Sequence, residues 1–121
     1  MPYRKSQFPY FSFRTNRDVL AKMGYLAALH GRSVNKEIEH ILLLHISSWN
    51  EKTAISDEDD IFLKPTSLPA RTAIRIAPEI LDSLKYIAQY NGRSTNKEIE
   101  QIILRYLRDW ENNKGTIPLD D

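Results

Sequence analysis

With 121 residues and a formal net charge of +1, the chain has the length of one ordinary domain and is too nearly neutral to coat nucleic acid as a nonspecific polycation. It has no cysteine, which excludes disulfides, thiolate nucleophiles and cysteine-ligated metals and suits the reducing cytoplasm. No apolar run approaches the ~18 residues of a membrane span, and none follows Arg4 and Lys5 as an export signal requires, so we expect a soluble protein that is not exported.

The first element predicted along the chain is a short strand that follows a basic arm at residues 1–9. Residues 1–17 contain no acidic residue, and their basic residues are Arg4, Lys5, Arg14 and Arg17. From residue 10 to residue 14 the chain alternates between two faces, one with Phe11 and Phe13 and the other with Tyr10, Ser12 and Arg14. A strand this short needs a partner strand.

Two helices are predicted after the strand, joined by a tight turn. Residues 15–18 have the form of a capping box from Thr15 to Asp18, and an apolar stripe at helical spacing continues for about four turns. Gly31 marks the end of this helix, because glycine readily adopts a left-handed backbone. Ser33 is placed to cap a second helix that runs through Trp49. Residues 10–50 therefore form one unit of strand, helix, turn and helix.

A linker is predicted at residues 51–70. Its first ten residues hold one lysine, Lys52, and five acidic residues: Glu51, Asp57, Glu58, Asp59 and Asp60. Such a charge run is typical of a solvated connection between folded units.

The same unit then occurs a second time. Residues 31–39 read Gly-Arg-Ser-Val-Asn-Lys-Glu-Ile-Glu and residues 92–100 read Gly-Arg-Ser-Thr-Asn-Lys-Glu-Ile-Glu, an offset of 92 − 31 = 61 at which Trp49 also matches Trp110. The second copy is assigned to residues 71–111, with a tail at 112–121. It contains an alternating strand at 71–76, Pro78 at a first helical position, and Ser94 as the cap of its second helix. Neither copy, at about 40 residues, is expected to fold alone.

The order of elements, with Gly-Arg-Ser-x-Asn-x-Glu-Ile at the turn between helices, resembles the ribbon-helix-helix superfamily of DNA-binding proteins, and most of all its Arc-like branch. The resemblance covers residues 10–50 and 71–111. It implies a mainly α fold in which two copies pair their strands into a short antiparallel β-ribbon, whose outward side chains enter the major groove of DNA. The base-reading positions that it implies are Tyr10, Ser12, Arg14, Arg71, Ala73 and Arg75. Arg14 and Arg75 are the strongest candidates, because arginine pairs with two acceptors of guanine.

The resemblance also implies a phosphate clamp at the start of each second helix. Unpaired backbone N–H groups and a partial positive charge gather there. The residues concerned are Ser33, Val34, Asn35, Ser94, Thr95 and Asn96, and Lys36 and Lys97 add charge nearby. An Arc-like core also contains a buried Arg-Glu-Arg network. Here we expect the pairs Arg32–Glu37 and Arg93–Glu98 in a more apolar core, because Ile41 and Ile102 replace the second arginine.

Two copies in one chain favour an intramolecular pseudodimer, similar to the tandem arrangement of TraY-type relaxosome proteins. The linker of about 20 residues can reach ~60–70 Å, and covalent linkage raises the effective concentration of one copy near the other. Because the two strands differ, we expect an asymmetric or direct-repeat DNA target, which several molecules could occupy side by side.

Other functions fit the sequence less well. An enzyme is disfavoured, because His40 and His45 are five apart, off the four-residue spacing of helical metal ligands, and no nucleophile motif or Gly-rich phosphate loop occurs. His30 is explained as a helix-end residue. We expect a transcriptional repressor or a plasmid transfer or partition protein. The alternative is an antitoxin or another protein-interaction scaffold, but the chain beyond Trp110 is too short for a domain that wraps a toxin. No cofactor, metal or small-molecule ligand is indicated.

Overall fold

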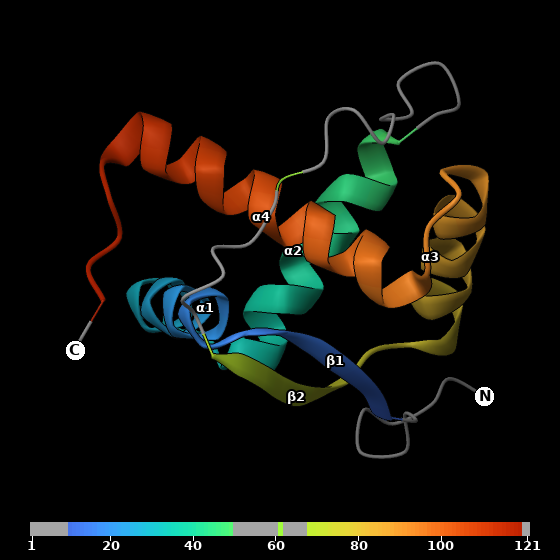
Figure 1. Ribbon diagram of the computed structural model, residues 1–121, viewed down its shortest axis with the longest axis horizontal. Helices are drawn as coiled ribbons and strands as arrows, with labels where there is room; N and C mark the ends of the chain where they lie inside the picture. The colour runs from blue at the N-terminus through green and yellow to red at the C-terminus, as the bar shows by residue number, and fades with distance from the viewer. Residues whose placement is uncertain (1–9, 50–60, 62–67, 120–121) are drawn as a thin grey trace.

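The computed structural model describes residues 10–49, 61 and 68–119 and contains two strands and four helices within them (Figure 1). The elements, in chain order, are β1 (Tyr10–Asn16), α1 (Arg17–Leu29), α2 (Val34–Ser48), β2 (Pro69–Arg75), α3 (Pro78–Tyr90) and α4 (Thr95–Lys114). The predicted order of strand, helix and helix, occurring twice, is confirmed. The basic arm, the acidic run and most of the predicted linker lie outside the described residues.

The two strands form one antiparallel ribbon within the chain. Its register pairs Tyr10 with Arg75, Ser12 with Ala73 and Arg14 with Arg71. The strand bounds differ from those predicted: β1 continues to Asn16, and β2 begins at Pro69 instead of residue 71 and ends at Arg75 instead of residue 76. The fold is therefore a tandem ribbon-helix-helix in which the two copies make an intramolecular pseudodimer.

The first helix of copy 1 begins differently from the prediction. Asn16, not Thr15, is the N-cap of α1, and its side-chain oxygen accepts a hydrogen bond from the N–H of Val19 at 2.9 Å. Thr15 is still part of the ribbon, opposite Ala70, so it cannot serve as the cap. The capping box from Thr15 to Asp18 was thus wrong, whereas the prediction of Pro78 at the start of α3 is confirmed.

The turn between the paired helices has the same geometry in both copies. Gly31 and Gly92 have φ values of 68° and 70°, in the left-handed region that a side chain disfavours. The N–H groups of Arg32 and Arg93 reach back to the carbonyls of Ala27 and Ala88, both at 2.8 Å. This pattern is a Schellman motif, which satisfies carbonyls at the end of each first helix. The predicted helix end at Gly31 is confirmed, and Gly92 of the repeated motif ends α3 in the same way.

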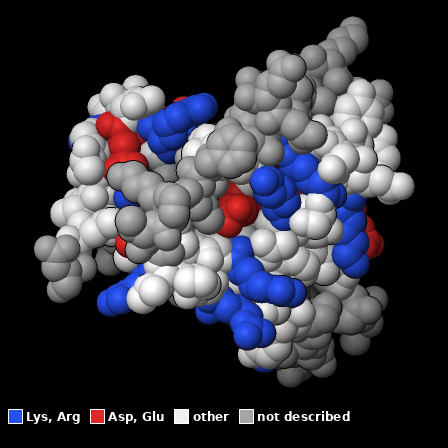
Figure 2. Space-filling model, viewed as in Figure 1, with Lys and Arg blue, Asp and Glu red and all other residues white. Residues whose placement is uncertain are grey.

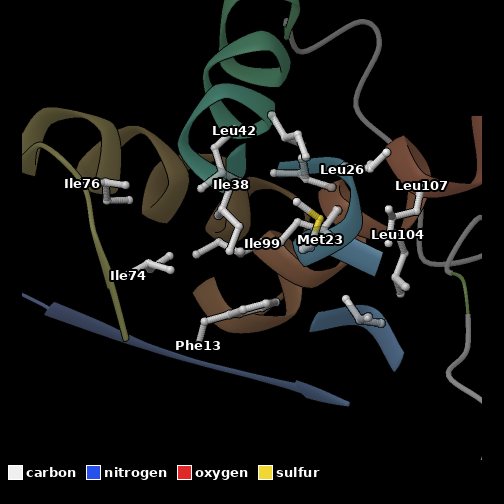
Figure 3. Packing of buried hydrophobic residues seen from close by; sticks show 14 of the residues in the cluster. Phe13, Met23, Leu26, Ile38, Leu42, Ile74, Ile76, Ile99, Leu104 and Leu107 are labelled. Carbon is white, nitrogen blue, oxygen red and sulfur yellow. The ribbon is translucent and has the colours of Figure 1, made fainter. Parts of the chain in front are cut away.

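A single core lies between the ribbon and the helices. Helices α2 and α4 pack against each other over one face of the ribbon, and α1 and α3 flank them (Figure 1). Phe13 and Ile74 point from the ribbon into the helices, where Met23 and Ile99 also lie (Figure 3). Because both copies supply residues to this one cluster, each copy completes the core of the other.

Segments outside the repeat make further contacts in the described part of the chain. The buried side chain of Gln101 bonds both the N–H and the C=O of Ile61, at 2.9 and 2.8 Å. In the tail, Ile117 is buried and its N–H donates to Glu111, which also pairs with Lys22 of α1 at 2.9 Å. Helix α4 itself continues past residue 111 to Lys114. Over the described residues, no helix is long and apolar enough to cross a membrane.

Candidate nucleic-acid interface

The outer face of the ribbon carries all six side chains that were predicted to read bases. Phe13, Ile74 and Ile76 are turned inward and buried, so the pleat forces the alternate residues outward. Tyr10, Ser12, Arg14, Arg71 and Ala73 are exposed, and Arg75 is half-buried. The structure therefore brings residues from both copies of the repeat into one solvent-facing row.

The two ends of this ribbon differ. At the end next to the start of α1, here the α1 end, Arg14 lies directly opposite Arg71. At the other end, the α3 end, Tyr10 lies opposite Arg75, and the guanidinium carbon of Arg75 sits 3.9 Å from the centroid of the tyrosine ring. Ser12 and Ala73 lie between them. Sequence alone did not pair these residues, because the strand register depends on both copies.

Asn35 and Asn96 fasten the ribbon with their side chains. Asn35 of α2 accepts from the N–H of Arg75 at 2.7 Å and donates to its carbonyl at 2.9 Å. Asn96 of α4 makes the same pair of bonds with the backbone of Arg14, both at 2.8 Å. Each asparagine holds the strand of the other copy. From the sequence we expected them only to bind phosphates, although their identical positions in the two copies indicated a shared structural role as well.

The starts of α2 and α4 consequently flank the ribbon, α2 at the α3 end and α4 at the α1 end. Ser33 and Ser94 are the N-caps, as predicted, and their hydroxyls accept from the N–H groups of Lys36 and Lys97 at 3.1 Å. The N–H groups at the first two positions of such a helix have no partner inside the helix. In these helices they belong to Val34, Asn35, Thr95 and Asn96.

The predicted pairs Arg32–Glu37 and Arg93–Glu98 are present beneath this surface. Glu37 and Glu98 are buried, and their oxygens lie 3.4 and 3.3 Å from the arginine nitrogens. The arginines differ, because the side chain of Arg32 is 36% exposed and that of Arg93 only 2%. Ile41 and Ile102 are buried, as expected for a more apolar core.

Each of these glutamates has a further partner that the sequence did not reveal. His30 contacts Glu37 at 3.0 Å, and Asn91, at the equivalent position, donates to Glu98 at 2.9 Å. Both residues are C-caps of first helices, so the helix-end explanation of His30 is incomplete rather than wrong. These groups stabilise the turn and the core.

His45 lies in the interface between the copies. Desolvation lowers its pKa from 6.5, the charges of Arg105 and Arg93 lower it further, and Glu98 opposes the shift. Tyr106 holds the equivalent position in copy 2, and burial raises its pKa, with a further contribution from Glu37. Among the described residues, no group of three or more His, Asp and Glu side chains is placed to hold a metal ion.

Basic side chains gather over the ribbon. In Figure 2, a group of blue Lys and Arg side chains lies among white surface in the lower middle of the face, where Figure 1 places β1 and β2, and other blue groups lie higher on the same face. The exposed arginines of the strands, Arg14 and Arg71, and Arg17 at the first position of α1 belong to this region of the fold.

A two-stranded ribbon that two helix pairs support, with outward polar side chains and helix starts at its ends, defines a ribbon-helix-helix protein. The family model described as the Arc-like DNA-binding domain matches this chain twice, at residues 5–45 and 71–108. The two matches cover more than half of the chain, and the protein belongs to this family of DNA-binding domains. A comparison with curated proteins finds no match.

Proposed function

We propose that the protein binds specific double-stranded DNA sequences by placing the outer face of its ribbon in the major groove. A two-stranded ribbon fits this groove, where the base edges distinguish all four base pairs. The proposal rests on the row of six outward side chains on a ribbon that two DNA-binding domains form. The proposed base readers are Tyr10, Ser12, Arg14, Arg71, Ala73 and Arg75.

The proposed phosphate contacts come from the starts of α2 and α4. Backbone N–H groups near Ser33, Val34, Asn35, Ser94, Thr95 and Asn96 would bind one phosphate on each side of the groove. The backbone is assigned this role, because the side chains of Asn35 and Asn96 are already bonded to the ribbon. Such contacts fix the position of the protein without selecting a sequence.

The biological role that we propose is transcriptional repression or an accessory role in plasmid transfer or partition. Each of these roles requires binding to a specific duplex site. Several molecules bound side by side would cover a longer stretch of DNA. The protein would act in the cytoplasm, in contact with the DNA.

A titration of fluorescent duplex DNA across a salt series tests the proposal. A groove-binding protein should lose affinity steeply as salt rises, because bound phosphates release counterions. The double variant Arg14→Ala with Arg75→Ala should keep its fold, since neither residue belongs to the hydrophobic core cluster, and lose about 1–3 kcal/mol of discrimination at each contacted base pair.

The matched control is Lys85→Ala with Lys114→Ala, which removes the same charge from exposed positions on α3 and α4. It should lower affinity for all duplexes slightly and leave sequence preference intact. If the arginine variant keeps the preference of the unaltered protein, the ribbon is not the reading element.

A further inference from the structure

The ribbon is held by a symmetric support. Asn35 bonds the backbone of Arg75 at 2.7 and 2.9 Å, and Asn96 bonds the backbone of Arg14 at 2.8 Å in both directions. Arg14 and Arg75 occupy equivalent positions of the two copies, so the two-fold relation between the copies places them at opposite ends of the ribbon. The backbone therefore presents two equivalent ends to DNA.

The side chains on these equivalent ends are not equivalent. In the register, Arg71 takes the place beside Arg14 that Tyr10 takes beside Arg75. The α1 end thus has two guanidinium groups directly across the ribbon, an arrangement that destabilises a free sheet because like charges repel. Neither of these two arginines forms an ion pair with a described acidic residue, and a polyanion would relieve the repulsion.

The start of the neighbouring helix adds to this difference. Arg17 is the first residue of α1 and is exposed, whereas Pro78 begins α3 at the equivalent position. At the α3 end the one arginine is stacked on Tyr10 at 3.9 Å, and an aromatic ring offers bases apolar contact but no bidentate hydrogen bond.

We infer that the protein binds an asymmetric DNA subsite in one orientation, in which the α1 end selects two guanines and the α3 end selects one. This inference rests on the proposed function. Arginine forms bidentate hydrogen bonds with guanine O6 and N7, so the end with Arg14 and Arg71 can read two guanines. At the α3 end only Arg75 can do this. The small residues at the centre, Ser12 and Ala73, leave room for the base pairs between.

Selection from a random duplex pool tests the inference when the protein is compared with two symmetrised variants. Tyr10→Arg with Ser12→Ala gives both strands the outward residues of β2, and Arg71→Tyr with Ala73→Ser gives both the residues of β1. All four positions are exposed, so folding should be preserved, and thermal unfolding of each variant checks this.

The unaltered protein should select a consensus without two-fold symmetry and richer in guanine contacts at one end. The first variant should select a palindrome with the guanine-rich half at both ends, and the second a palindrome made of the other half. Replacing either guanine under the α1 end should weaken binding by about tenfold or more in the unaltered protein, and for one of the two guanines the loss should be much smaller in Arg71→Ala.

A palindromic consensus for the unaltered protein would overturn the inference, as would symmetrised variants that keep its consensus or a selected site without the predicted guanines. If none of the proteins enriches any duplex, the proposed function itself fails, and this outcome is distinct from the others.

Discussion

At the scale of single residues, the asparagines of the repeat couple the two copies. Asn35 and Asn96 each bond a strand that belongs to the other copy, over 40 and 82 residues of sequence. The sequence could predict that both positions matter, because the motif around them is repeated. It could not predict which group each asparagine side chain binds, because an asparagine in a first helical turn can hydrogen-bond a DNA phosphate or a protein backbone group equally well.

Replacing Asn35 or Asn96 with alanine should destabilise the protein. Each change removes two hydrogen bonds to a ribbon end, for which we expect a loss of about 1–3 kcal/mol in the free energy of unfolding, larger for the partly buried Asn35. Urea unfolding measures it. Asn113→Ala is the control, since its side chain donates only to the carbonyl of Asp109 at an exposed site. Equal effects of all three changes would contradict the fastening role.

The two buried glutamates should respond differently to neutralisation. Glu98→Gln leaves Arg93 charged with a side chain only 2% exposed, and breaking such a buried pair costs about 3–5 kcal/mol. Glu37→Gln should cost less, because Arg32 is partly exposed and can turn to water. Chemical denaturation of the two variants gives the comparison, and a larger loss for Glu37→Gln would show that exposure of the arginine does not set the cost.

At the scale of secondary-structure elements, local patterns predicted most of the fold. Serine caps, glycine stops and apolar spacing gave the helices correctly, because these signals act within a few residues. The start of α1 was missed because its Thr-x-x-Asp pattern competes with strand pairing, and the pairing of Thr15 with Ala70 is invisible locally. The pairing of Arg14 with Arg71 and of Tyr10 with Arg75 was not predicted either, because strand register cannot be read from the local sequence.

Removing one backbone N–H tests the phosphate clamp at the start of α4. Thr95→Pro replaces the first helical residue, a position that tolerates proline, and Ser94 before it has the extended backbone that a following proline requires. Affinity should fall for specific and random duplexes alike, with sequence preference retained. Thr95→Ala keeps the N–H and should bind normally, so equal binding by the two variants would exclude this amide as a phosphate ligand.

The interface between helices α2 and α4 should make stability depend on pH through His45. Its pKa is lower in the folded protein than the ordinary 6.5, so unfolded chains bind the proton first. Stability should therefore fall as pH drops below about 6.5 and level off below the folded pKa.

Denaturation from about pH 7.5 to about pH 5.5 should show a shallower decline for His45→Gln than for the unaltered protein. His40→Gln is the control, because glutamine already stands at the equivalent position 101. An unchanged pH dependence in His45→Gln would rule out the buried histidine as its source.

At the scale of the whole molecule, the chain is a dimer made from one polypeptide, and its two sides have diverged. Of the connecting segment, the described residues Ile61 and Leu68 make contacts with the two copies: Ile61 bonds Gln101, and the carbonyl of Leu68 accepts from the N–H of Arg17 at 2.8 Å. In the tail, Ile117 is buried. The repeat predicted that the two copies pair. These further contacts involve residues outside the repeat, and the repeat therefore could not predict them.

Native mass spectrometry of the protein on its smallest high-affinity duplex shows whether one chain is sufficient to bind DNA. We predict free chains of 14.1 kDa and a complex that contains one chain per duplex, since β1 and β2 already pair within it. A complex that forms only with two chains, from a protein that is dimeric when free, would show that the ribbon is built between molecules and would contradict the account.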